Sequence, residues 1–167
     1  VEKDRVSYFI PSFKEMKLPD NSSTLDEWAE HGIEDQDFLD TVEYSLIRGY
    51  HDKIDYRWSP AIPRRLIIPF YWNNVIVGYT SRAIGDNSMR YINHKPADYL
   101  YNNEIIYDDR QILFVVEGPL DATAIDGVGI LGSKLNANQI TWLKSSGKEI
   151  IVVPDIDKDG YKMTDMA

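Results

Sequence analysis

The sequence has 167 residues, 43% hydrophobic and 12% aromatic, enough for one packed core and a small second one. Because it contains no cysteine, a disulfide framework and cysteine-bound zinc are excluded, and any metal must be held by oxygen or histidine. No stretch approaches the roughly 20 apolar residues of a membrane span, and a signal-peptide pattern is absent, so we expect a cytoplasmic protein without membrane partners.

The net charge of −9 is unevenly distributed along the chain. Residues 1–57 carry 7 basic and 14 acidic side chains, residues 58–112 carry 6 and 5, and residues 113–167 carry 5 and 8. The positive middle third suits an enzyme that holds phosphates beside an acidic metal site, although an ordinary solvated surface explains the same counts. Its arginines are Arg64, Arg65, Arg82, Arg90 and Arg110.

Two helices are predicted near the N-terminus, after a loop over residues 11–23. Thr24 and Glu27 have the spacing of a capping box that opens a short helix, which Gly32 ends. A second helix is predicted over residues 35–48, before Gly49. Its apolar residues recur at helical spacing, which indicates a structural role. They are Phe38, Leu39, Val42 and Leu46.

The middle of the chain predicts a β-hairpin. Residues 65–71 and 75–82 are β-rich runs, and Asn73 and Asn74 between them tolerate the positive φ of a tight turn. Residues 91–93 predict a further short strand.

The last third alternates short apolar strands with helices, which is typical of a parallel sheet covered on both faces. Such a sheet gathers its active site at the carboxyl ends of the strands. The expected order is a strand over 112–116, a helix from about residue 120, a strand over 128–131, a helix over 137–145 capped by Asn136, and a strand over 149–153.

Carboxylates follow two of these strands. Glu117 and Asp121 come after the first strand, and Asp155 and Asp157 come after the last. Clustered carboxylates repel one another, so a divalent cation such as Mg²⁺ or Mn²⁺ is their natural partner. Gly118 would let the backbone turn so that Glu117 projects into the crevice.

Each acidic segment alone has a less specific interpretation. A strand that ends in Glu-Gly is common, and residues 155–160 match the opening of an EF-hand calcium loop. The EF-hand interpretation fails because a β-run precedes Asp155 and because position twelve is Met166 rather than Glu. The two segments together, 38 residues apart from Glu117 to Asp155, are far more specific than either half.

This pair of segments resembles the signature of the TOPRIM family, which includes primases, topoisomerases, recombination mediators and some nucleases. Residues 114–122 resemble its first motif, residues 127–132 its middle strand and glycine turn, and residues 152–160 its second acidic motif. The upstream residues are similar to the lobe that precedes TOPRIM in DnaG-type primases. That resemblance runs through Arg65 to Pro69, Gly78 to Arg82, and Arg90 to Asn93.

The resemblance covers residues 64–160 and is strongest to the phage-encoded branch, in which proline follows Glu-Gly. It implies an α/β fold with a TOPRIM-type parallel sheet and flanking helices, preceded by a small mixed α+β lobe that contains the hairpin. We expect a helical segment over residues 1–57, a basic β-rich lobe over 58–111, and a TOPRIM subdomain over 112–167 that is incomplete at its C-terminus.

The implied function is synthesis of short RNA primers on single-stranded DNA for replication, in a bacterium or a phage-infected cell. Glu117, Asp155 and Asp157 would be catalytic and, with Asp121, would hold Mg²⁺ or Mn²⁺. The partners would be a single-stranded DNA template, ribonucleoside triphosphates and a replicative helicase, fused or separate. Nucleic-acid or nucleotide phosphates would be held by Arg64, Arg65, Arg82, Arg90 and Lys134.

The chain departs from the primase pattern in three ways. Asn102 and Asn103 occupy the region where the family has a lysine, no zinc-binding module precedes the lobe, and the chain stops at Ala167 before the TOPRIM pattern is complete. We therefore expect a fragment of a longer protein.

Two other functions remain open. A TOPRIM nuclease would need similar carboxylates, and a catalytically silent module would keep the fold for binding nucleic acid. The tryptophans are expected to be structural, although Trp72 and the pair Tyr99 and Tyr101 could stack on single-stranded bases.

Overall fold

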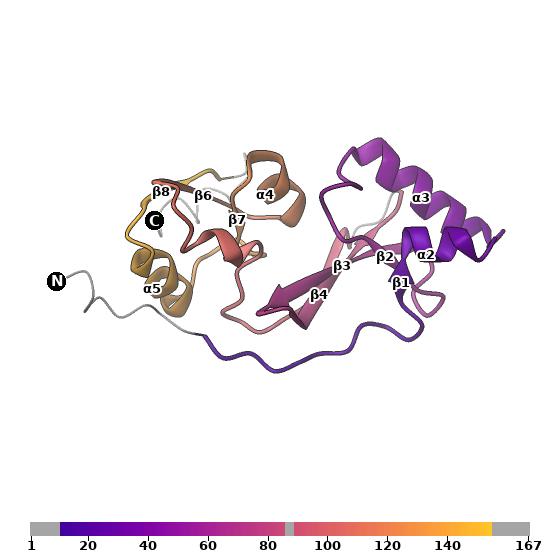
Figure 1. Ribbon diagram of the computed structural model, residues 1–167, viewed down its shortest axis with the longest axis horizontal. Helices are drawn as coiled ribbons and strands as arrows, with labels where there is room; N and C mark the ends of the chain where they lie inside the picture. The colour runs from indigo at the N-terminus through magenta and orange to yellow at the C-terminus, as the bar shows by residue number, and fades with distance from the viewer. Residues whose placement is uncertain (1–10, 86–88, 155–167) are drawn as a thin grey trace. The chain divides into compact units, whose positions relative to one another are not determined.

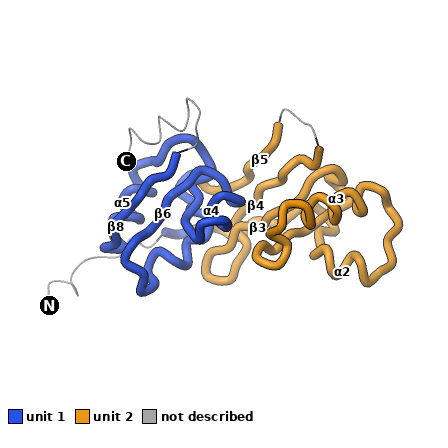
Figure 2. Tube along the Cα trace, turned by 90° about the horizontal axis from the view of Figure 1, so that it is seen from above, with its two compact units in different colours: residues 1–12, 97–167 blue, residues 13–96 orange. Residues whose placement is uncertain are grey.

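The computed structural model describes residues 11–85 and 89–154, which fall into two compact units. One unit comprises Phe13–Pro96, and the other comprises Val1–Ser12 with Ala97–Ala167 (Figure 2). No described helix combines the length and the apolar character needed to span a bilayer.

The unit of residues 13–96 is built on a five-stranded antiparallel sheet (Figure 1). Its strands lie in sequence order and are β1 (Ser23–Thr24), β2 (Arg57–Trp58), β3 (Arg65–Trp72), β4 (Val75–Ala83) and β5 (Tyr91–His94). The sheet confirms the predicted hairpin, formed by β3 and β4, and the short strand that follows it.

The local chemistry of the hairpin explains its sharp turn. Asn73 and Asn74 connect the strands with φ values of 49° and 65°, a left-handed conformation that asparagine tolerates better than most residues. Farther along β4, a Cβ atom on Gly78 would lie 2.5 Å from the carbonyl oxygen of His94. Only glycine therefore allows β5 to approach this closely.

Two helices accompany this sheet, α2 (Leu25–Glu30) and α3 (Gln36–Arg48), and Thr24 caps the start of α2 and Gly49 the end of α3 as the sequence predicts. The hydroxyl of Thr24 accepts a hydrogen bond of 3.1 Å from the Glu27 backbone N–H. Gly49 ends α3 with a φ of 75°, which glycine adopts without steric cost.

The orientation of α3 is not the one that its apolar spacing indicates. The helix packs against β3 and buries Phe38, Thr41 and Ser45, whereas Leu39 and Leu46 are 44% and 54% exposed. Thr41 and Ser45 can be buried because each hydroxyl donates a hydrogen bond to a backbone carbonyl of its own helix. The interpretation of α3 as a structural helix therefore holds for one of its faces.

The other unit contains a three-stranded parallel sheet in the order β7-β6-β8. Its strands are β6 (Ile112–Val116), β7 (Val128–Gly129) and β8 (Glu149–Val152), and the helices between them are α4 (Pro119–Ile125) and α5 (Ala137–Ser145). A short 3-10 helix, η1 (Asn103–Ile105), precedes β6. The predicted alternation of strands and helices is confirmed, and with the antiparallel sheet it confirms the α/β fold class.

Hydrogen bonds hold the N-terminus of helix α5, both within the helix and to a residue outside it. Asn136 and Gln139 form the reciprocal hydrogen bonds of a capping box, and the Gln139 amide donates a further bond of 3.0 Å to the carbonyl of Tyr99. Tyr99 is only 1% exposed. The idea that Tyr99 stacks on nucleic-acid bases is therefore wrong, because its ring is part of the core.

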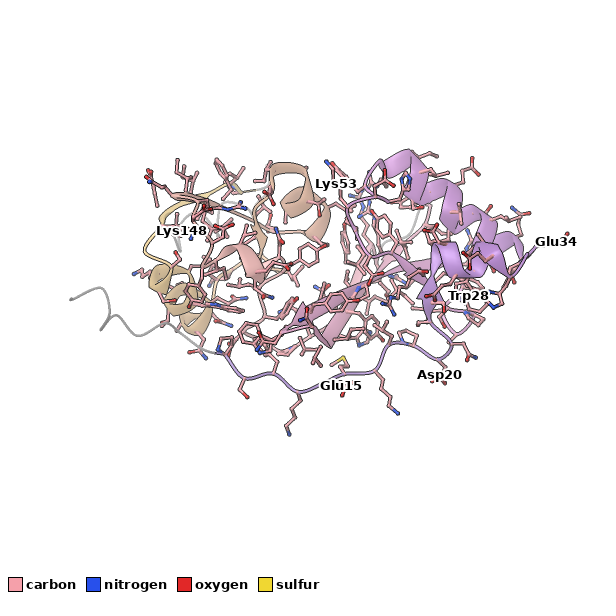
Figure 3. All side chains as sticks on the ribbon, viewed as in Figure 1. Glu15, Asp20, Trp28, Glu34, Lys53 and Lys148 are labelled. Atoms are coloured by element: carbon pink, nitrogen blue, oxygen red, sulfur yellow. The ribbon has the colours of Figure 1, made fainter. Side chains whose placement is uncertain are left out.

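The ammonium group of Lys148, just before β8, is a buried positive charge. Figure 3 labels this residue. Its side chain is 5% exposed, and its Nζ donates to the carbonyl oxygens of Ile106 and Asp108 at 2.9 and 2.6 Å. The Asp108 carboxylate lies 3.6 Å from Nζ. Lys148 thus fastens the start of β8 to the segment that precedes β6.

We expect Lys148→Met to lower the free energy of unfolding by about 2–4 kcal/mol, because it leaves two carbonyl groups without their donor. Chemical denaturation checks the value. Lys144→Met is the matched control, since Lys144 lies nearby at the end of α5 but is exposed. Equal effects of the two substitutions would show that Lys148 contributes no more than a surface lysine.

Candidate functional site

The turn after β6 positions the first acidic residue of the predicted metal site. Glu117 is half-buried, and its carbonyl oxygen accepts a hydrogen bond of 2.7 Å from the backbone N–H of Leu131. The backbone of β7 lies against the same turn, because a Cβ atom on Gly129 would be 3.2 Å from the carbonyl oxygen of Gly118. Contacts from β7 and from the residue Leu131 that follows it therefore fix where the Glu117 side chain leaves the backbone.

Asp121, in the first turn of α4, lies beside the same turn. Its Oδ2 is 3.7 Å from the position that a Cβ atom on Gly118 would occupy. This separation is an ordinary van der Waals contact. The structure thus places Asp121 beside the turn that carries Glu117, at the carboxyl end of β6.

Strand β8 runs alongside β6 in the same direction. Val115 pairs with Val152, and the backbone N–H of Val153 donates to the Val115 carbonyl at 2.8 Å. The chain therefore leaves β8 beside the end of β6, as the sequence predicts. Asp155 and Asp157, the other two predicted ligands, lie outside the described residues.

The chemistry of the described carboxylates fits a hard divalent cation, which takes oxygen ligands. Glu117 and Asp121 supply such oxygens at a turn whose backbone is fixed. Among residues 11–85 and 89–154, no group of three or more His, Asp or Glu side chains is close enough to hold a metal ion. The described part of the chain thus provides two of the four predicted ligands.

The predicted phosphate-binding arginines lie in the other unit, and Arg65 is held by backbone groups. Its guanidinium donates to the carbonyl oxygens of Ser81, at 2.7 Å, and Met89. Burial disfavours the charged form and lowers the pKa of Arg65 below its ordinary value. Arg64 points elsewhere and forms an exposed ion pair of 2.8 Å with Asp37 of α3.

Arg82 is almost completely buried, with 8% of its surface exposed. Its guanidinium carbon lies 4.8 Å from the ring centre of Tyr91 and 5.8 Å from that of Tyr44, and its Nε donates a 2.7 Å hydrogen bond to the Tyr44 hydroxyl. Burial opposes the charge, but Tyr91 and Tyr44 outweigh that cost and raise the pKa of Arg82.

Sequence patterns predict no role in binding Arg82 for either tyrosine of this arrangement. Tyr91 belongs to the segment that resembles primases, but the sequence does not show that this residue of β5 pairs with Arg82 of β4. Tyr44 belongs to α3, and no sequence pattern connects it with a residue 38 positions away.

Arg90 and Lys134 are exposed like Arg64, but unlike Arg64 they make no ion pair with a described residue. Neither side chain forms a hydrogen bond or ion pair with another described residue. Arg90 is close to Arg65 and Arg82 in the sheet, because its carbonyl accepts from the N–H of Ala83, the residue that pairs with Arg65. The structure therefore brings three of the predicted arginines to one end of β3, β4 and β5, while Lys134 belongs to the other unit.

The remaining predictions concern aromatic side chains and Arg110. The Trp72 ring packs edge-on against Phe13, with ring centres 5.7 Å apart. Arg110 forms ion pairs with Asp108 and Asp126 at 2.8 and 3.3 Å. Arg110 therefore links the segment before β6 to the end of α4.

No protein-family model matches this sequence, and a search of curated proteins found no match. The structure, in contrast, is similar to solved primase structures. A DNA primase domain from Pseudomonas aeruginosa has a TM-score of 0.56 at 23% identity, over 69% of this chain and 40% of that one. The E. coli primase catalytic core has a TM-score of 0.52 at 23% identity, over 60% and 37% of the two chains.

A DnaG primase catalytic domain bound to single-stranded DNA has a TM-score of 0.52 at 22% identity, over 60% of this chain and 38% of that one. This chain thus spans about two fifths of the length of the structures that it matches. At these identities the likeness establishes the fold. The resemblance inferred from the motifs is confirmed at that level: over the matched part, this chain has the fold of a DnaG-type primase catalytic core.

Proposed function

We propose that this chain is part of a DNA primase that synthesises short RNA primers on single-stranded DNA. The observation that supports the proposal most strongly is the position of Glu117. It lies at the carboxyl end of β6, beside the strand that leads into Asp155 and Asp157, within a fold shared with DnaG catalytic cores. The single-stranded DNA in one of the similar structures supports the same kind of template.

In this proposal Glu117, Asp155 and Asp157 are catalytic and, with Asp121, hold one or two Mg²⁺ or Mn²⁺ ions. When bound, such ions lower the pKa of the primer 3′-hydroxyl and neutralise charge on the triphosphate. The fixed turn at Gly118 keeps Glu117 in place before any ligand arrives. The backbone that carries its carboxylate therefore needs little reorganisation when a metal binds.

The basic residues Arg64, Arg65, Arg82, Arg90 and Lys134 would orient template and triphosphate. The contacts within the protein divide this set. Arg64, Arg65 and Arg82 are already engaged by protein groups, whereas the side chains of Arg90 and Lys134 are exposed and bind no partner among the described residues. Arg90 and Lys134 therefore provide the clearest tests of phosphate binding.

The proposal is tested with the full-length parent protein, single-stranded DNA, ribonucleotides and Mg²⁺, beside an active primase as control. Short RNA products support it. The absence of RNA products while the control primase is active would contradict the proposal. Cleavage of DNA without ribonucleotides would instead identify a metal-dependent nuclease. DNA binding that does not depend on Mg²⁺, with no catalytic turnover, would identify a non-catalytic nucleic-acid-binding module.

We expect Arg90→Ala to weaken binding of single-stranded DNA and to lower the slope of log K against log salt by about 0.7, the value for one lost phosphate contact on a single strand. The thermal midpoint should not change, because Arg90 is exposed and holds no described partner. Titrations of labelled DNA at several salt concentrations measure the slope. Lys53→Ala is the matched control, an exposed cation in an acidic region (Figure 3). A slope that Arg90→Ala leaves unchanged contradicts the assignment.

A further inference from the structure

Helix α3 presents apolar side chains to solvent while it buries polar ones. Leu39, Leu46 and Ile47 are 44%, 54% and 75% exposed, whereas Thr41 and Ser45 are at most 1% exposed. Leu39 and Leu46 are seven residues apart and therefore share one face of the helix, with Val42 between them. We call Leu39, Val42, Leu46 and Ile47 the α3 stripe. Apolar side chains that gather on one exposed face commonly mark an interaction site.

The α3 stripe continues into a hollow of about 420 Å³. Val42 and Leu46 line this hollow together with Leu25 at the start of α2 and with Ile54, which lies beyond the end of α3. The acidic side chains of Asp26, Asp52 and Asp55 line it as well. The stripe and the hollow thus form one surface that combines apolar side chains with carboxylates, and we call these carboxylates its acidic border.

The surroundings of this surface are strongly acidic. Residues 20–55 contain 11 acidic and 2 basic side chains, a net charge of −9 that equals the charge of the whole chain. Glu43 lies on the exposed side of α3, and Glu34 projects from the loop between α2 and α3 (Figure 3). The net negative charge of the protein is therefore concentrated in the segment that contains the α3 stripe.

The negative charge of this segment favours some binding partners of the surface over others. A second copy of this chain would bring two faces of the same sign together, and nucleic acid or an anionic lipid surface would also be repelled. A basic partner is attracted by the same field. The stripe from Leu39 to Leu46 is about two helical turns, roughly 10 Å long, which matches apolar residues at positions i, i+3 and i+7 of a second helix.

We propose that the α3 stripe and its hollow dock an amphipathic helix of a partner protein, which inserts apolar side chains and surrounds them with lysine or arginine. This inference goes beyond the proposed priming activity and does not depend on it. The apolar contact supplies the affinity, and the acidic border selects a basic helix over an acidic one.

The probe is a labelled synthetic peptide of about 18 residues, with leucine along one helical face and lysine on the other. Three versions are compared by fluorescence anisotropy: the peptide itself, one with glutamate in place of lysine, and one of equal composition whose leucines are scattered around the helix. We expect only the first to bind with an affinity that falls as salt is added.

Leu46→Ser should weaken binding of the first peptide by about tenfold or more, because a leucine that the peptide would bury is removed. Val75→Ser is the matched control, since Val75 is 41% exposed in the hairpin, outside the stripe and hollow. Leu39→Ser serves as a second variant should Leu46→Ser lower the thermal midpoint.

Equal binding of the scattered or glutamate peptide would overturn the proposal, and so would equal effects of Leu46→Ser and Val75→Ser. Sedimentation of the protein alone tests the competing occupant. Self-association that Ile47→Ser abolishes would show that a second copy covers the stripe, and it would likewise overturn the proposal. Because none of these measurements uses nucleotides, failure here is distinguishable from failure of the priming assay.

Discussion

Glu117→Gln is expected to reduce Mg²⁺-dependent primer synthesis at least about a hundred-fold, since a divalent ion held at this site is worth several kcal/mol to the reaction. The fold should remain intact. Removal of one charge relieves repulsion between carboxylates, so the thermal midpoint without Mg²⁺ should stay the same or rise. Asp109→Asn is the matched control, an exposed carboxylate of the same unit away from the end of β6.

The second acidic segment extends this test. Asp157→Asn should be as damaging as Glu117→Gln, whereas Asp159→Asn should be nearly silent, because the family resemblance places an uncharged residue at that position. Priming rates and thermal midpoints, with and without Mg²⁺, are measured for all three variants. Equal damage from Asp159→Asn and Asp157→Asn would show that the metal is placed wrongly.

Arg82→Ala should cost about 2–4 kcal/mol of unfolding free energy, because it removes a buried cation from between two tyrosine rings and deprives the Tyr44 hydroxyl of its partner. Chemical denaturation measures the loss. Arg48→Ala is the matched control: Arg48 also lies over the Tyr44 ring, at 5.4 Å, but is exposed. A loss no greater than that of Arg48→Ala would contradict the structural role.

The same variant decides whether Arg82 also contacts phosphate. A drop of about 0.7 in the salt slope of single-stranded DNA binding would indicate a phosphate contact. An unchanged slope, together with the loss of stability, would make Arg82 a purely structural residue. Tyr44→Phe separates the two contributions of the tyrosine, because it keeps the ring and removes the hydroxyl.

The elements that the sequence predicted well are those with local causes. The Thr24 cap, the Asn136 cap and the Asn73-Asn74 turn each act within four residues, and the structure places all three as expected. The position of Glu117 was also predictable, because a parallel sheet puts residues that follow its strands at one edge. These features depend on short-range chemistry and on a general rule of topology.

The contacts that escaped prediction depend on packing between distant residues. Apolar spacing in α3 could not reveal that Thr41 and Ser45 face β3 while Leu46 faces solvent. The burial of Arg82 results from the register of β4 with β5 and from the approach of α3, neither of which leaves a local signal. Arginine in a phosphate-binding motif and arginine in a core look alike in the sequence.

The two sheets should differ in how quickly they form. The β3–β4 hairpin closes through a tight turn of two asparagines, whereas β6 and β8 pair residues 37 positions apart, from Ile112 to Glu149. Closing the longer loop costs more chain entropy before any contact repays it, so parallel pairing is intrinsically slow. We expect the hairpin to gain protection from hydrogen exchange early in refolding and β8 late. The surroundings of Glu117 would then be assembled in the last kinetic phase.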